Sequence, residues 1–161
     1  MTPSSKKRMI YIIIIIAVVL LLPVIFLAVQ SALAKRPDKL GVQNGRLADC
    51  PKSPNCVSTQ ATDAQHQIEP IPFDGAAADA IRRIKAALAT LPGTKIITEK
   101  EDYLHAEATS LIFRFVDDVE FFVDKGAKKI HFRSASRAGY SDLGVNRSRM
   151  EKFRTAFMET R

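Results

Sequence analysis

The feature that most constrains this chain is a run of twenty residues without a charge, Ile10 to Val29 (IYIIIIIAVVLLLPVIFLAV). As an α-helix with a rise of 1.5 Å per residue, such a run extends about 30 Å, which equals the hydrocarbon thickness of a bilayer. Pro23 lies inside the run, and membrane helices tolerate a proline of this kind. The run therefore predicts a transmembrane anchor over residues 10–33.

A cleaved signal peptide is the alternative to an anchor. The stretch Ala32-Leu33-Ala34 offers the small residues of a cleavage site. The apolar core of a signal peptide is usually only about 7–15 residues long, however, and the greater length of this run favours a retained anchor.

The charges beside the run predict its orientation. Lys6, Lys7 and Arg8 precede it, so the positive-inside rule predicts that residues 1–9 are cytoplasmic. The rest of the chain would then be a periplasmic domain on the single-pass anchor, at the inner (cytoplasmic) membrane. The asymmetry is reduced by the basic residues after the run, which are Lys35, Arg36 and Lys39.

Cys50 and Cys56 are the only cysteines, and they enclose five residues in the stretch CPKSPNCVSTQ. A redox pair normally has two intervening residues. A lipid-bearing cysteine would directly follow the apolar run. A zinc site needs about four ligands, and no histidine lies at a familiar spacing from the pair. An exported domain meets an oxidising compartment, so we expect a disulfide that stabilises a short loop by about 2 kcal/mol. In a reducing compartment the thiols would stay free.

Residues 34–46 (AKRPDKLGVQNGR) are typical of a polar linker, and one domain is expected over residues 47–161. Irregular chain continues to about Phe73. Apolar residues then recur at helical spacing from Ala77 to Leu91, where Pro92-Gly93 ends the pattern.

Five short segments rich in β-branched and aromatic residues follow, and they predict strands: TKIITE, YLHAEAT, LIFRFV, DVEFFVD and KIHFRSAS. Met150, Phe153 and Phe157 lie on one face of a second helical pattern near the C-terminus. This order predicts an α+β domain, in which two helices cover one face of an antiparallel sheet of about four to five strands.

Three stretches, CPKSPNCVSTQA, FRFVDDVEFFVD and RSASRAGYSDLGVNRSRMEKFR, resemble in this order the signatures of an uncharacterised family, domain of unknown function number 1499. The resemblance extends from about Leu47 to Phe157 and covers nearly all of the chain beyond the anchor. Members of this family occur in bacterial envelopes and in plastid-bearing organisms. The family has no established activity, so the resemblance implies candidate positions but no mechanism.

The turn DKGAK predicts a hairpin whose register decides which charged residues meet. If Val123 faces Ile130, alternation directs the apolar side chains to one face of the sheet. Glu120 then lies directly opposite Arg133 on the other face, within reach of a charge-assisted hydrogen bond. Arg114, in the expected strand LIFRFV, would point to the same polar face.

This polar face offers carboxylates and imidazoles of the kind that hydrolases use for proton transfer. The candidate catalytic residues are Asp118, Glu120, His105 and His131. No nucleophile elbow, phosphate loop or zinc-helix motif accompanies them. The carboxylates suit calcium or magnesium, but alternation sends Asp117 to the opposite face and nearby arginines compete for the others. We therefore expect no metal site and no cofactor.

The segment RSASRAGYSDLGVNR is rich in donors that suit a carboxylate, a phosphate or a glycan. The candidate ligand-binding residues are Arg133, Arg137, Tyr140, Asn146 and Arg147. In the alternative, the arginines only neutralise the acidic residues of the preceding strand and fix the loop on the sheet. Arg137 is expected to be the freer group, with Glu120 and Arg133 as a structural pair.

These features predict a membrane-anchored envelope protein whose domain binds another envelope protein or an anionic small molecule on the polar face. A hydrolase that uses Asp118, Glu120 and a histidine is the alternative, and a structural accessory of a membrane complex is a second one. Nucleic acid is not an expected partner, because an exported domain rarely meets it. The net charge of +7 also falls to +4 without the three basic residues before the anchor. A pocket around a histidine and Glu120 would favour the enzyme, and an open polar face the binding module.

Overall fold

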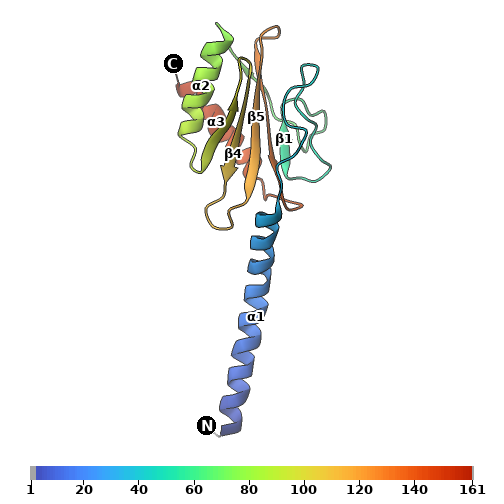
Figure 1. Cartoon of the computed structure of the whole chain (residues 1–161), viewed down its shortest axis with the longest axis vertical. Coiled ribbons are helices and arrows are strands. Elements are labelled where there is room, and N and C mark those ends of the chain that lie inside the picture. Colours follow the sequence, from blue (N-terminus) through green and yellow to red (C-terminus); the bar gives the residue numbers. More distant parts are fainter. Residues whose placement is uncertain (1–2, 161) are drawn as a thin grey trace.

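A computed structural model of the chain describes residues 3–160, and it separates a long N-terminal helix from a compact domain (Figure 1). Residues 1, 2 and 161, which belong to the expected cytoplasmic N-terminus and C-terminal domain, lie outside this range. Helix α1 spans Pro3–Leu33 and includes Pro23. From Lys7 to Leu33 it is long and apolar enough to cross a membrane, and no part of its most apolar stretch is buried against the domain. A membrane anchor and a signal sequence both have these properties.

The domain is built on an antiparallel sheet in the order β1-β6-β5-β4-β3, with β2 also paired to β6. The four longer strands come from the expected region: β3 (Thr94–Glu99), β4 (Tyr103–Thr109), β5 (Val116–Asp124) and β6 (Lys129–Ser136). Two short strands, β1 (Cys56–Ser58) and β2 (Ile71–Pro72), come from the segment expected to be irregular. They pair along the edge of β6 and raise the number of strands to six.

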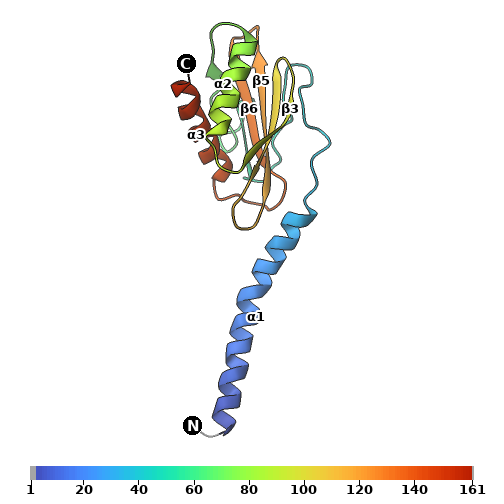
Figure 2. The same ribbon diagram turned by 60° about the vertical axis from the view of Figure 1, so that its left-hand side comes forward.

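Helices α2 (Ala77–Ala89) and α3 (Val145–Glu159) lie together on one face of this sheet (Figure 2). The core lies between them and the sheet, where Ile84, Phe121, Phe132 and Phe153 are buried. The rings of Phe121 and Phe153 are 4.5 Å apart between centroids, so α3 packs directly on the centre of the sheet. The α+β fold with two helices on one face is confirmed.

The predicted hairpin register is also confirmed. Val123 pairs with Ile130 and Glu120 pairs with Arg133. A shift by one residue would turn the buried rings of β5 and β6 to the polar face and the charges into the core, so this register has no close competitor.

The prediction of a strand at LIFRFV is wrong for most of its length. Residues 110–115 form the turn between β4 and β5, closed by a hydrogen bond from the Ser110 backbone N–H to the Phe115 carbonyl. Arg114 has a positive φ of 57° in this turn, so it does not extend the polar face as expected. The turn contains no glycine, proline or asparagine, and its apolar residues therefore resemble a strand in sequence.

Candidate functional site

The face of the sheet opposite the helices carries rows of ionisable side chains. One row runs from His105 on β4 through Glu120 on β5 to Arg133 on β6, and Glu107 and Asp118 begin the next row. Their side chains share a face because residues paired across antiparallel strands point the same way. Four of them, all except Glu107, are buried. We call this surface the polar face.

Asp118 is the centre of one cluster on the polar face. Its two carboxylate oxygens accept hydrogen bonds from Arg137, with Nε 2.8 Å from Oδ2 and Nη2 2.6 Å from Oδ1. His105 Nε2 lies 2.8 Å from the same Oδ1. Burial raises the pKa of Asp118, but the hydrogen bonds from Arg137 and His105 outweigh burial and hold that pKa below its ordinary value. Asp118 is therefore an ionised carboxylate at neutral pH.

Glu107 joins this cluster to the segment that follows α1. Its Oε1 accepts hydrogen bonds from Arg137 and from Arg36, which is 71 residues away in sequence. Burial raises the pKa of Glu107, and the hydrogen bonds from the two guanidinium groups lower it further than burial raises it. Hydrogen bonds to Asp118 and Glu107 raise the pKa of Arg137 above its usual range. Arg137 thus stays charged between two carboxylates.

Glu120 is the centre of a second cluster. Its Oε1 accepts hydrogen bonds from the Tyr103 hydroxyl and from the Gly41 backbone N–H, both at 2.8 Å. Its Oε2 accepts a longer one, at 3.3 Å, from Arg133 Nη1. Burial and the charge of Glu120 raise the pKa of Tyr103 well above its usual value, so Tyr103 remains a hydrogen-bond donor.

Arg133 is the least satisfied member of the polar face. It is buried, and its Nε has no hydrogen-bond partner among the residues that the structure describes. Besides Thr94 Oγ1, it is the one such side-chain atom in that part of the chain. Within this range its guanidinium forms a single ion pair, the one-point contact with Glu120. The buried N–H of Arg133 is therefore available to an acceptor that the chain itself does not supply.

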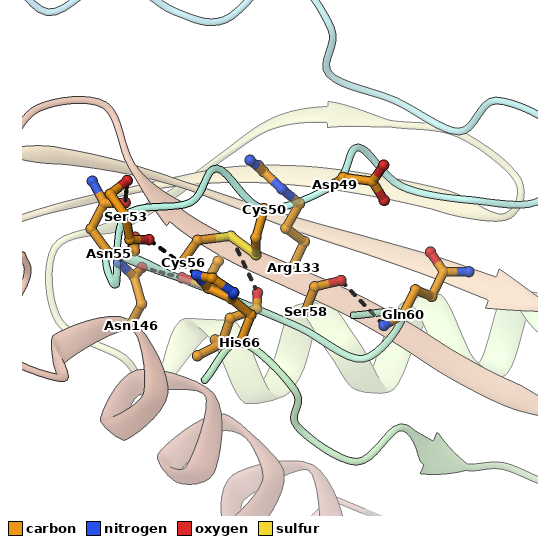
Figure 3. The surroundings of a disulfide bond; sticks show 12 residues. Asp49, Cys50, Ser53, Asn55, Cys56, Ser58, Gln60, His66, Arg133 and Asn146 are labelled. Carbon is orange, nitrogen blue, oxygen red and sulfur yellow. Dashed lines mark hydrogen bonds between the residues drawn. A yellow bond between two sulfur atoms is a disulfide. The ribbon is translucent and has the colours of Figure 1, made fainter. Parts of the chain in front are cut away.

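The disulfide expected between Cys50 and Cys56 is present, and Arg133 belongs to its surroundings (Figure 3). Cys56 pairs with Ala135 and Ser58 pairs with Arg133, so the disulfide loop lies beside β6. Asn55 ties this loop to the chain after β6 through a hydrogen bond from its Nδ2 to the Gly139 carbonyl. The disulfide thereby fixes one border of the polar face.

The polar face is covered, so it is not the open surface that would favour a binding module by itself. Residues 36–47, which we call the covering segment, lie over it in place of a free linker. Arg36 and Gly41 bind the two glutamates, and Val42 and Leu47 pack with Tyr103 and Phe122 in a small apolar cluster. Gln60 holds the segment from the other side, because its Oε1 accepts the Leu47 N–H and its Nε2 donates to the Gly45 carbonyl. The ionisable groups are therefore sealed by a short stretch of chain that leads directly to α1.

The remaining predicted site residues do not join these clusters. The Nδ1 of His131 lies 3.1 Å from the Thr59 hydroxyl, and the ring stacks on Phe122. Asn146 is buried on the helix side, where it contacts Ser134 and Asn55, and Arg147 donates to the carbonyls of Gln65 and Gln67. Tyr140 is exposed in the loop before α3.

The expectation that Arg137 is the freer arginine is wrong, and the reason is geometric. Arg137 follows the end of β6 and lies level with both Asp118 and Glu107, which satisfy it from two sides. Among the residues that the structure describes, Arg133 pairs only with Glu120, which already accepts two shorter hydrogen bonds. Asp117 points to the opposite face, as alternation predicts, and pairs with Arg149 of α3.

Sequence reasoning missed Tyr103, Glu107, Arg36 and Gly41. The alternation of the stretch YLHAEAT could have found the first two, because it places Tyr103, His105 and Glu107 on one face. Nothing local indicates that residues 36–47 fold back over the sheet.

Metal ligation is not favoured by this arrangement. Over residues 3–160, no group of three or more His, Cys, Asp or Glu side chains could hold an ion. The three carboxylates, Glu107, Asp118 and Glu120, are instead matched by three guanidinium groups, Arg36, Arg133 and Arg137. Two cavities, of about 350 and 520 Å³, lie elsewhere, at the start of α3 and beside Arg147.

Comparison with known proteins gives one match. The family model described as a protein of unknown function, DUF1499, matches residues 46–157. No curated protein and no solved structure matches the chain. The matched region includes the disulfide, the sheet, α2 and most of α3, and it begins one residue before the end of the covering segment.

Proposed function

The chain belongs to the DUF1499 family, and we propose that it is a membrane-anchored binding module whose recognition site is the polar face around Arg133. The ligand presents an acceptor group, a carboxylate or a phosphate, on a partner protein or on a small molecule. The covering segment occupies the site when no ligand is bound.

The observation that carries this proposal is the buried Arg133 Nε, which has no hydrogen-bond partner within residues 3–160. A buried donor left unsatisfied costs free energy, about 1–3 kcal/mol and more for a charged group. Planar guanidinium groups bind carboxylates and phosphates through two parallel N–H groups. In Arg133 one Nη already contacts Glu120, which leaves Nε to an incoming oxygen.

The burial of so many charges supports the same conclusion. Replacing a buried ion pair by apolar residues is often neutral or stabilising. A contribution to stability therefore does not by itself explain why a protein contains buried ion pairs. Here the paired groups of three strands are buried together under one segment of chain. A recognition site that opens when this segment moves accounts for both the charges and their cover.

The cellular setting follows from α1 and the disulfide. We infer that α1 is a retained anchor with a cytoplasmic N-terminus. The domain is then exported to an oxidising compartment, in which a disulfide persists. The module would then present the polar face close to the membrane surface, to partners of the cell envelope.

The test is affinity capture of the full chain from native membranes, with mass spectrometry of co-purified proteins and small molecules. Arg133→Gln is compared with wild type and with Arg82→Gln, a control that removes an exposed ion-paired arginine of α2. We expect one set of molecules with wild type and Arg82→Gln, and its loss with Arg133→Gln. The same set on all three proteins would refute the proposed site.

A hydrolase is the second candidate, and the contact between His105 and Asp118 favours it. A carboxylate that orients an imidazole is a usual part of acid/base sites. Both side chains are buried under the covering segment, and Asp118 is shared with Arg137. Turnover of chromogenic ester or phosphate substrates that is lost in His105→Asn but kept in Arg133→Gln would favour the enzyme over the binding module.

A further inference from the structure

Two loops of the domain present large apolar side chains to solvent. In the β4–β5 turn, Leu111 and Ile112 are 90% and 79% exposed. In the loop between β6 and α3, Tyr140 and Leu143 are 76% and 93% exposed. Among the described residues outside α1, only two other large apolar side chains are exposed, and one of them, Val145, directly follows the second loop.

Both loops lie at the end of the domain from which α1 extends (Figures 1 and 2). The contacts agree with this placement. The Arg137 backbone N–H, at the start of the second loop, donates to the Val116 carbonyl at the end of the first. Arg36, three residues after α1, binds Glu107, which is three residues before the first loop. These contacts hold the end of α1 and the two loops close together at the same end of the domain.

The length of α1 determines how far its C-terminal end lies from the hydrocarbon of a bilayer. If Ile10–Val29 spans the hydrocarbon, Gln30–Leu33 add about 6 Å of helix. The headgroup layer on each side of the hydrocarbon is about 5–8 Å thick. The helix therefore ends within the headgroup layer, and so do the loops beside it.

We propose that the β4–β5 and β6–α3 loops insert their apolar side chains into the same membrane leaflet that α1 enters. The partner is the lipid bilayer itself, and the inference rests on the proposed anchor. Burial of Leu111, Ile112, Tyr140 and Leu143 among lipids removes from water an apolar surface that the fold leaves exposed. The orientation of the domain on the membrane is then fixed by three contacts with the bilayer, which are made by α1 and by the two loops.

The other side chains of the loops fit a membrane surface. Arg114 is exposed in the first turn, where a long basic side chain can lie along lipid and bind headgroup phosphates. The carboxylate of Asp142 in the second loop accepts the backbone N–H groups of Gly144 and Asn146, which reduces the cost of bringing this charge close to lipid. Leu143 also lines the cavity of about 350 Å³ together with Leu91, Pro92 and Val145, so apolar surface continues beyond the loop tip.

Both tips are held in an unfavourable backbone conformation. Arg114 and Leu143 have positive φ angles of 57° and 54°, a region that bulky residues rarely adopt. Glycine, which has no Cβ atom, would adopt these angles without strain, so backbone conformation does not explain why Arg114 and Leu143 stand at these positions.

The absence of tryptophan from the chain permits a direct test with single-tryptophan variants. Leu111→Trp and Leu143→Trp are compared with Ala127→Trp, in the β5–β6 hairpin at the opposite end of the domain. Each full-length variant is reconstituted into vesicles of phosphatidylcholine and phosphatidylglycerol, with and without bromine on the upper part of the acyl chains. We expect blue-shifted emission and several-fold stronger quenching by brominated lipid for positions 111 and 143 than for position 127.

Emission and quenching equal to those of Ala127→Trp at both loop positions would overturn the inference. Blue-shifted emission without quenching by lipid would also overturn it, because the loops would then contact protein, such as a second copy. Extraction of the vesicles with alkaline carbonate shows whether α1 itself is inserted in the membrane, which distinguishes absence of loop insertion from absence of the anchor. A chain that is extracted lacks the proposed anchor, whereas a retained chain with unquenched loops refutes loop insertion alone.

Discussion

Arg137 binds both carboxylate oxygens of Asp118, with Nε and Nη2 at 2.8 and 2.6 Å, and the Asp118 side chain is only 1% exposed. The pair joins the chain after β6 to the middle of the sheet. In contrast, Arg133 reaches Glu120 through a single contact at 3.3 Å. The two arginines of one segment therefore differ in their contacts: Arg137 is bound by both oxygens of Asp118, whereas Arg133 makes one long contact and is the arginine that we propose for the ligand.

The first prediction compares these two arginines by unfolding in detergent micelles. Arg137→Gln leaves Asp118 buried without its main partner, and we expect a loss of about 3–5 kcal/mol of unfolding free energy. Arg133→Gln removes one hydrogen bond from a carboxylate that keeps two others, and it also removes the unsatisfied Nε. The two effects oppose each other, so the net loss should be smaller than for Arg137→Gln, under about 3 kcal/mol. Arg82→Gln, at an exposed pair, should cost under about 1 kcal/mol. A loss for Arg137→Gln no larger than that of the control would contradict the assignment.

The second prediction concerns acid and the covering segment. The pKa of Glu107 is lower in the folded protein than its unfolded value of 4.5, so the unfolded chain binds more protons and stability falls as pH falls. The stability that ionised Glu107 contributes is fully present above pH 4.5. It is lost below that pH, as Glu107 becomes protonated in the folded protein. Arg36→Gln should therefore lower the free energy of unfolding by the same amount from pH 7 down to pH 4.5, and by progressively less below pH 4.5. An effect of Arg36→Gln that stays constant from pH 7 to acid would show that Arg36 does not act through Glu107.

A third prediction addresses the disulfide. Thiol labelling of the denatured protein should modify Cys50 and Cys56 only after reduction. Because the bond closes a short loop, replacement of both residues by serine should cost about 2 kcal/mol of stability. Labelling without reductant would exclude the bond in the cell.

A fourth prediction tests orientation. Protease added to spheroplasts should digest the domain while cytoplasmic marker proteins stay intact, and the remaining fragment should stay in the membrane. Full protection of the domain would reverse the orientation. Recovery of a soluble chain that begins near Lys35 would instead identify α1 as a cleaved signal sequence.

The sheet register was predictable because it follows from short-range rules. Alternation along β5 and β6, with a hairpin turn between them, leaves one register that buries Phe121 and Phe132 and pairs Glu120 with Arg133. The covering segment was not predictable in the same way. Its hydrogen bond from Gly41 to Glu120 joins residues 79 apart in sequence, and a polar linker composition gives no sign of such a contact.

The status of the arginines was equally inaccessible from sequence. Charge pattern alone pairs basic with acidic residues, but hydrogen-bond geometry decides which guanidinium is saturated. The chain direction after β6 carries Arg137 to the ends of both Asp118 and Glu107. Likewise, the turn at residues 110–115 has the composition of a strand, and only the pairing of β4 with β5 shows that the chain must reverse there.

Binding of the ligand by Arg133 Nε can be tested by nuclear magnetic resonance of arginine Nε–H groups in the full chain in detergent micelles. Arg133→Gln assigns the signal by its disappearance. On addition of the fraction that co-purifies with the wild-type chain, we expect this signal to shift while that of Arg82 stays in place. An unchanged Arg133 signal, under conditions in which other signals of the domain report binding, would show that Arg133 Nε does not bind the ligand.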